Sequence, residues 1–87
     1  MSKFKGTPGP WEAVECRVYF GNAGDISLHN APDAEANAKL IATAPQLLLA
    51  LQDAEEILRG ALGNLPSVRS RVDAYADLIA KALGEQP

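Results

Sequence analysis

The residues that could carry out chemistry are few and far apart in this chain. Its 87 residues include one histidine, His29, and one cysteine, Cys16. A structural zinc site needs four closely spaced Cys or His ligands, and a nucleophilic triad needs a Ser or Cys beside an oriented base. Neither arrangement is present. We therefore expect no catalytic residue, no metal ligand and no cofactor, and the chain is predicted not to be an enzyme.

A glycine-containing segment, Gly21-Asn22-Ala23-Gly24, invites comparison with phosphate-binding loops. It has no lysine at the position that contacts phosphate, and no helix pattern follows it. Gly, Asn and Asp in such density are typical of a tight turn between two strands. The segment is therefore predicted to be a hairpin turn.

Cations and aromatic side chains occur together near the N-terminus. Lys3, Lys5 and Arg17 accompany Trp11 and Tyr19. Cations can hold phosphates while a flat ring stacks on a base, so this group could bind a nucleotide. Two alternatives stay open, because Trp11 could instead anchor the core of a sheet and the two lysines could lie on a frayed terminus.

Two arginines, Arg69 and Arg71, fall in the first turns of a predicted helix. The N-terminus of a helix is the positive end of the helix dipole and suits a phosphate-bearing ligand. The alternative is a solvated face on which Arg69 pairs with Asp73 at i,i+4. His29 could bind a ligand through its titratable ring or serve as a surface or capping residue. The predicted ligand-binding residues are Trp11, Arg17, Tyr19, His29, Arg69 and Arg71.

The first thirty residues are predicted to form an arm and a small β-meander. Prolines and glycines in residues 1–10 are typical of an extended arm. Alternation and Val/aromatic content then predict strands near 11–15, 17–20 and 26–29. The meander therefore spans 11–30.

The remainder is predicted to be helical. Pro32 and the acidic residues that follow it favour a short helix over 32–43. Thr43 could cap a second helix over 44–62, with Pro45 in its first turn. Gly63 to Pro66 would end that helix, and Ser67 could cap a third one that runs to 83. The short connection predicts an antiparallel helical hairpin over 44–83. The fold class is thus α+β, in the order βββααα, as a single small domain over 1–87.

Composition narrows the possible partners. The net charge is −3, and it arises entirely after residue 30, so a duplex-nucleic-acid partner is not expected. A single cysteine cannot form an internal disulfide and favours a cytoplasmic setting. No stretch is long and apolar enough for a membrane span.

Alanine is the commonest residue among the 47% that are apolar. So much apolar surface in so short a chain predicts a homo-oligomer.

Two segments carry a resemblance to a known set of proteins. They are Thr7-Pro8-Gly9-Pro10-Trp11, and Ala36-Asn37-Ala38-Lys39-Leu40-Ile41-Ala42-Thr43-Ala44-Pro45 followed by a Leu-rich helix. Together they resemble small phage and prophage proteins with a TPGPW opening and an NA[KR]LIAxAP segment. The layout is also similar, in architecture alone, to phage anti-Thoeris sponges, which oligomerise and sequester cyclic ADP-ribose-type signals.

The resemblance implies a phage protein of the host bacterial cytosol. Its function would be to sequester a nucleotide-derived immune signal of the host without turning it over. The alternative is a protein-interaction or structural accessory module that uses the apolar helical hairpin for oligomerisation or for docking a partner.

Overall fold

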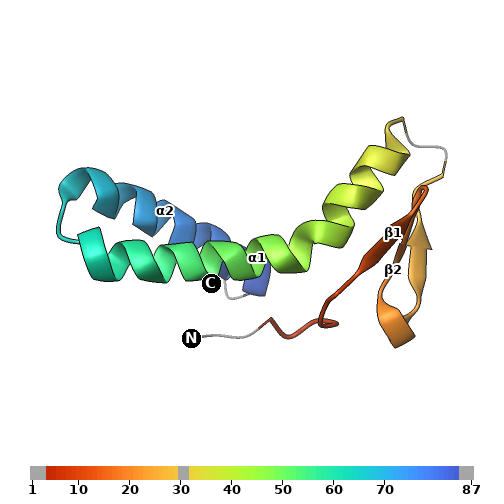
Figure 1. Ribbon diagram of the computed structural model, residues 1–87, viewed down its shortest axis with the longest axis horizontal. Helices are drawn as coiled ribbons and strands as arrows, with labels where there is room; N and C mark the ends of the chain where they lie inside the picture. The colour runs from red at the N-terminus through yellow and green to blue at the C-terminus, as the bar shows by residue number, and fades with distance from the viewer. Residues whose placement is uncertain (1–3, 30–31, 85–87) are drawn as a thin grey trace. The chain divides into compact units, whose positions relative to one another are not determined.

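A computed structural model describes residues 4–29 and 32–84 of the chain, and it shows a small sheet followed by two helices (Figure 1). The strands are β1 (Glu12–Val14), β2 (Arg17–Tyr19) and β3 (Asp25–Ser27), with a 3-10 turn η1 (Gly21–Ala23) between the last two. The helices are α1 (Ala34–Leu62) and α2 (Pro66–Leu83). The predicted α+β class is confirmed.

The chain divides into two compact units, and α1 contributes to both. Among the described residues, the sheet unit lies within 5–47, and the hairpin unit consists of 48–84 together with Phe4. The sheet unit therefore holds the three strands and the first half of α1. The hairpin unit holds the second half of α1 and all of α2. Whether 1–87 behaves as a single domain stays a prediction.

The sheet is an antiparallel meander in the order β1-β2-β3. Val18 at the centre of β2 lies opposite Ala13 of β1 and Ile26 of β3. The three predicted strands are confirmed, and so is the turn that begins at Gly21. Two residues, Glu15 and Cys16, join β1 to β2, and Glu15 has a φ of 55°. This left-handed conformation is uncommon outside glycine, Asn and Asp, and it lets the chain reverse within two residues.

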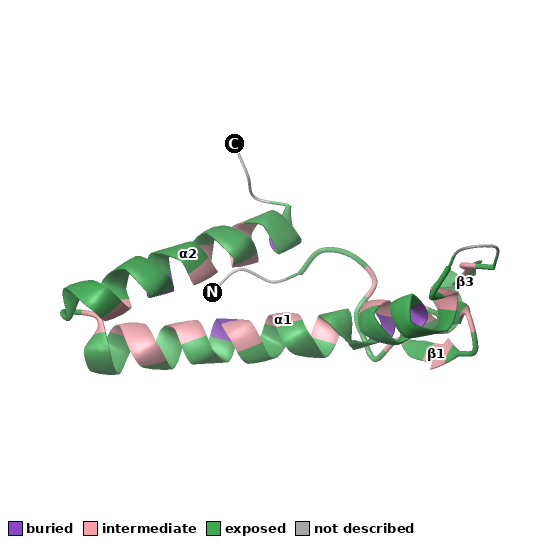
Figure 2. Ribbon diagram, turned by 90° about the horizontal axis from the view of Figure 1, so that it is seen from above, coloured by how far each residue is buried: buried purple, intermediate pink, exposed green. Residues whose placement is uncertain are grey.

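One face of the sheet packs against the first half of α1. Alternate residues along the strands point to this face, as the period of two requires. Val18 of β2 and Ala38 of α1 are each 0% exposed, and Ala42 is also buried. The buried positions of α1 beside the sheet are purple in Figure 2. Around these three lie the partly buried side chains of Trp11, Ala13, Phe20, Leu28 and Ile41. The alanines let the helix backbone approach the sheet closely. The core of this unit is therefore built from a few small buried side chains.

The structure corrects one prediction about the helices. The segments 32–43 and 44–62 are not two helices, because α1 runs without interruption through Pro45. Thr43 does not cap a new helix. Its Oγ1 donates a hydrogen bond back to the carbonyl of Lys39 at 2.8 Å, a bond that Thr makes inside a continuing helix. Proline removes one backbone hydrogen bond, but its fixed φ is compatible with the helix.

Packing around Pro45 offers a compensation for that lost bond. The proline is half-buried, and an ideal Cβ added to Gly9 would lie only 2.9 Å from Pro45 Cβ. The segment before β1 therefore passes directly over the proline ring, at a distance that only a residue without a side chain allows. Two segments 36 positions apart thus meet in the sheet unit, and both belong to the motifs that carry the phage resemblance.

The start of α2 also differs from the prediction. Leu65, in an extended conformation, is the N-cap and Pro66 opens the helix, so Ser67 does not cap it. The N–H groups of Val68 and Arg69 both donate to the carbonyl of Leu65, at 3.0 and 2.8 Å. Proline suits the first helical position, where no N–H is needed. At the other end, Gly84 adopts the left-handed conformation and closes the helix.

The hairpin unit packs the second half of α1 against α2 around a small set of side chains. Gln52 of α1 and Val72 and Leu83 of α2 are buried. Leu51, Leu58, Val68, Tyr75 and Ile79 are half-buried. Ala54 and Ala61 of α1 stay exposed. The predicted hairpin is confirmed, but several large apolar side chains of its helices stay exposed. Within the described residues, no helix is long and apolar enough to cross a membrane.

The contact between Gly9 and Pro45 predicts a specific cost for a single methyl group. Gly9→Ala should destabilise the protein by about 1–3 kcal/mol, because the added Cβ forces a shift of the proline or of the arm. Gly60→Ala is the matched control. An added Cβ there meets nothing within 4 Å, and alanine is favoured over glycine in a helix by about 1 kcal/mol. Urea unfolding followed by circular dichroism should move in opposite directions for the two variants, and equal shifts would contradict the packing.

Candidate functional site

The six predicted ligand-binding residues fall in both units of the chain. Trp11, Arg17, Tyr19 and His29 belong to the sheet unit, whereas Arg69 and Arg71 belong to the hairpin unit. Within the sheet unit the strand alternation separates them further. Trp11 faces α1, and Arg17 and Tyr19 point to the opposite face of the sheet. Lys3, which the predicted cation–aromatic group also included, lies outside the described residues.

Trp11 occupies the core side of the sheet unit. Its ring meets Phe20 edge to face, with centroids 4.9 Å apart and an interplanar angle of 86°. Its Nε1–H donates a hydrogen bond to the carbonyl of Thr7 at 3.2 Å. This arrangement satisfies both the apolar ring and its one donor, and it matches the structural alternative for Trp11. The ring is half-buried.

Arg17 and Tyr19 share the outer face of the sheet with Asp25. The guanidinium of Arg17 forms a hydrogen bond and an ion pair with the Asp25 carboxylate on β3. That hydrogen bond, reinforced by the charge of Asp25, raises the pKa of Arg17 above its ordinary value. Tyr19 lies directly opposite Asp25 in the β2–β3 register and is exposed. The outer face therefore presents an aromatic ring beside a cation that already has a carboxylate partner.

His29 lies just after β3 and makes contacts within its own loop. A hydrogen bond joins its Nδ1 to Ser27 Oγ at 2.6 Å, and its backbone N–H donates to the same oxygen at 3.4 Å. Side-chain hydroxyls make such local bonds where a strand ends. The ring is exposed, so its other nitrogen can reach solvent.

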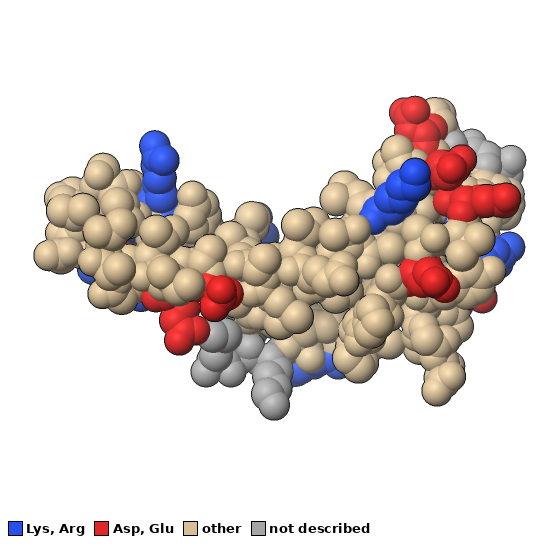
Figure 3. All heavy atoms as spheres, viewed as in Figure 1, with Lys and Arg blue, Asp and Glu red and all other residues tan. Residues whose placement is uncertain are grey.

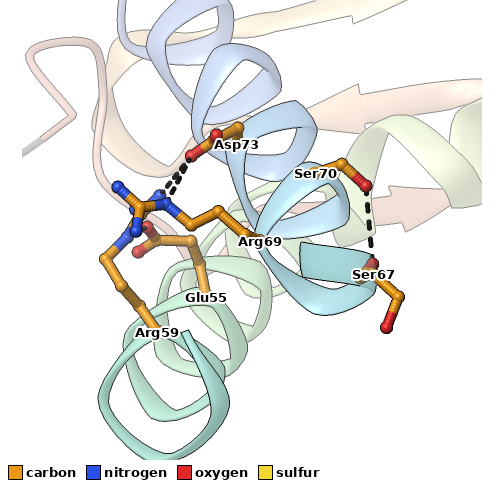
Figure 4. A network of polar contacts seen from close by, with 6 residues as sticks. All are labelled: Glu55, Arg59, Ser67, Arg69, Ser70 and Asp73. Atoms are coloured by element: carbon orange, nitrogen blue, oxygen red, sulfur yellow. Dashed lines mark hydrogen bonds and ion pairs between the residues drawn. The ribbon is translucent and has the colours of Figure 1, made fainter. Parts of the chain in front are cut away.

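The arginines of the hairpin unit lie in and around a network of charges (Figure 4). Arg59 of α1 donates from Nε to Glu55 Oε1 at 2.7 Å and from Nη2 to Asp73 Oδ1 of α2 at 3.3 Å. Arg69 Nε lies 3.8 Å from the same Asp73 oxygen. The alternative expectation of an Arg69–Asp73 pair is thus confirmed. The hydrogen bond to Glu55 raises the pKa of Arg59, and desolvation partly opposes the rise.

Arg59 is not among the predicted ligand-binding residues. Its i,i+4 spacing from Glu55 is a sequence signal for an ion pair, but its reach across to α2 depends on the hairpin register. Asp73 therefore receives one arginine from each helix and ties them together. Arg71 is exposed and takes no part in the ion pairs drawn in Figure 4.

The first turn of α2 offers few backbone donors to an anion. Pro66 has no N–H, and the N–H groups of Val68 and Arg69 are already bonded to Leu65. The helix-terminus part of the predicted phosphate site is therefore largely occupied. In the described part of the chain, no group of three His, Cys, Asp or Glu side chains is placed to hold a metal ion.

Charged side chains are unevenly spread over the face shown in Figure 3. Acidic groups gather over the sheet and the start of α1, whereas wide stretches over the helices show neither acids nor bases. Many large apolar side chains of the helices are exposed: Leu40, Leu47, Leu49, Ile57, Leu62 and Leu78. The surface feature that stands out on the described part of the helices is thus apolar.

A three-stranded meander with a helical hairpin, in which Arg17, Arg59 and Arg69 are held in ion pairs, defines a small α+β protein. The family described as Salmonella phage P22 protein Y8K6 matches residues 1–86, and the chain belongs to this phage protein family. The predicted phage origin is confirmed at this level. Neither the curated proteins nor the solved structures contain a match to the chain. The likeness to anti-Thoeris sponges stays a prediction.

The position of the two aromatic rings predicts opposite outcomes for their removal. Trp11→Ala should cost about 3–5 kcal/mol, because it empties part of the core and leaves Phe20 and Thr7 without their partner. Tyr19→Ala, on the exposed outer face, should change stability by less than about 1 kcal/mol. Thermal and urea unfolding of both variants measure this difference. A Trp11→Ala protein as stable as the wild type would contradict the structural role of Trp11 and would favour a role in ligand binding.

Proposed function

We propose that this phage protein acts by binding rather than by catalysis, and that its working form is an assembly of copies of its own chain. The observation that carries the proposal is the exposed apolar surface of the helices. Leu40, Ile57 and Leu78 are among the large side chains that are more than half exposed. A monomer seldom leaves so many leucines in water on neighbouring elements, and such surfaces mark interaction sites.

The energetic argument for self-association follows from the size of the chain. A protein of 87 residues buries only about 60–65% of the surface that its unfolded chain exposes. Each further 100 Å² of apolar surface that is removed from water contributes about 2.5 kcal/mol. Covering even part of the exposed leucines would therefore add stability that one copy alone lacks.

The arrangement of charged groups supports binding over catalysis. Arg17, Arg59 and Arg69 are each paired with a carboxylate. A substrate would have to compete with these carboxylates for the three guanidinium groups. Cys16 is a free thiol, which suits the reducing cytosol of the host as the place of action.

Self-association predicts a definite solution mass. Size-exclusion chromatography with light scattering should give a mass of at least two chains of 9.2 kDa at micromolar concentration. Dilution should reduce the apparent mass and lower the melting temperature together, because assembly is coupled to folding. A mass of one chain at every concentration would refute the proposal.

A second candidate function is the sequestration of a nucleotide-derived immune signal of the host. One feature of the hairpin unit favours it. Arg71 is exposed and lies one helical turn before the half-buried ring of Tyr75, so a cation and an aromatic ring are neighbours on α2. Such a pair can contact a phosphate and a base together. Arg69 lies nearby but is already paired with Asp73.

Sequestration predicts binding without turnover. Isothermal titration of the folded protein with cyclic dinucleotides, cyclic trinucleotides and cyclic ADP-ribose isomers should give a saturable signal for at least one of them. Mass spectrometry should then recover that ligand unchanged. Arg71→Ala should weaken binding by about 10-fold or more, the equivalent of one charge-assisted hydrogen bond, and Ser70→Ala is the exposed neighbouring control. No heat with any of these ligands would end this candidate.

A further inference from the structure

We infer that the outer face of the sheet, the face turned away from α1, binds an arginine side chain that a partner protein presents. The arginine lies against the ring of Tyr19 and beside the carboxylate of Glu12, which are direct neighbours across β1 and β2. The inference goes beyond the functions proposed above, because it concerns a different surface and a ligand of opposite charge to a nucleotide.

The strand register decides which side chains are neighbours on this face. Tyr19 of β2 lies directly opposite Glu12 of β1 on one side and Asp25 of β3 on the other. The Cβ atoms of directly opposite residues are about 4.5–5.5 Å apart. The exposed ring of Tyr19 is therefore flanked by a carboxylate on each side. The full outer face consists of Glu12, Val14, Arg17, Tyr19, Asp25 and Ser27.

The Asp25 side of the ring already holds a cation from this chain. Arg17 forms an ion pair with Asp25, although its own side chain stays 47% exposed. Arg17 also lies two residues before Tyr19 on the same face of β2, since side chains alternate along a strand. Asp25 raises the pKa of Arg17 most, and Tyr19 adds a smaller contribution because it lies close by. The chain thus keeps a guanidinium between a carboxylate and this ring.

The Glu12 side of the ring offers the same groups without the cation. Within residues 4–29 and 32–84, no Lys or Arg forms an ion pair with Glu12. Glu12 is exposed, and Tyr19 is 40% exposed. A carboxylate attracts a cation, and the negative face of an aromatic ring attracts it as well. A guanidinium from outside can therefore take up beside Glu12 the position that Arg17 has beside Asp25.

The chemistry of these groups favours arginine over other cations. A guanidinium is planar, so it can stack on Tyr19 while it donates two hydrogen bonds to the Glu12 carboxylate. Val14 follows Glu12 on the same face of β1 and is 48% exposed, which offers an apolar contact to the stem of an arginine. One exposed charge pair contributes little by itself, so further contacts from a protein segment are needed for binding.

Charge identifies the partner as basic. The described part of the sheet unit carries three Lys or Arg and five Asp or Glu side chains. Figure 3 shows acidic side chains gathered over this unit. Such a surface attracts a basic segment and repels nucleotides and anionic lipids, because electrostatic complementarity governs the encounter of charged partners.

A short basic peptide provides a direct test on the full-length chain. The acetylated and amidated peptide Arg-Thr-Arg-Thr-Arg should give saturable shifts of the backbone amide signals of β1 and β2 in a nuclear magnetic resonance titration. Glu12→Gln should raise the dissociation constant at least about threefold, because it removes the charge beside the ring. Tyr19→Ala should have an effect of similar size, because it removes the ring. The same peptide with glutamate in place of arginine should not bind.

Glu56→Gln is the matched control. Glu56 is an exposed carboxylate on the hairpin-unit part of α1, and its substitution changes the net charge by the same amount as Glu12→Gln. It should change the dissociation constant by less than about 1.5-fold. Equal effects of Glu12→Gln and Glu56→Gln would show that only the overall charge matters and would overturn the inference. So would the absence of saturable shifts at millimolar peptide. A protein that proves monomeric refutes the proposed self-association and leaves this inference standing.

Discussion

The sheet unit depends on the close approach of α1 to the small sheet. Val18 and Ala38 are completely buried against each other's elements, and alanine at this position lets the helix backbone come near the strands. Gly9 repeats the same constraint at Pro45, where a methyl group has no room. The segments that mark this chain as similar to phage proteins thus perform packing. Gly9, Ala38 and Ala42 are small residues at the positions where two segments approach closely.

The hairpin unit depends on a different constraint, the pairing of its charges. Asp73 accepts contacts from Arg59 and Arg69, so one carboxylate neutralises cations from both helices. Exposed ion pairs of this kind contribute about 0–1 kcal/mol each to stability.

Local patterns predicted the elements better than they predicted the site. Alternation identified the three strands, but the same alternation places Trp11 and Tyr19 on opposite faces of the sheet, which separates the predicted aromatic–cation group. Thr43 and Pro45 resemble a helix start in sequence. They lie inside α1 because Thr43 bonds backwards to Lys39, a choice that depends on the packing of the whole unit. Reach across elements, as from Arg59 to Asp73, likewise has no local signal.

The large share of apolar residues has a physical meaning in the hairpin, where Leu49, Ile57 and Leu78 are more than half exposed. These side chains stay largely in water, so they add little to the stability of a single copy. A sequence under selection for the monomer alone would gain from polar residues at those positions, because exposed apolar side chains promote aggregation. Exposed apolar side chains on neighbouring elements are instead typical of an interaction surface, which is the property that the proposed self-association requires.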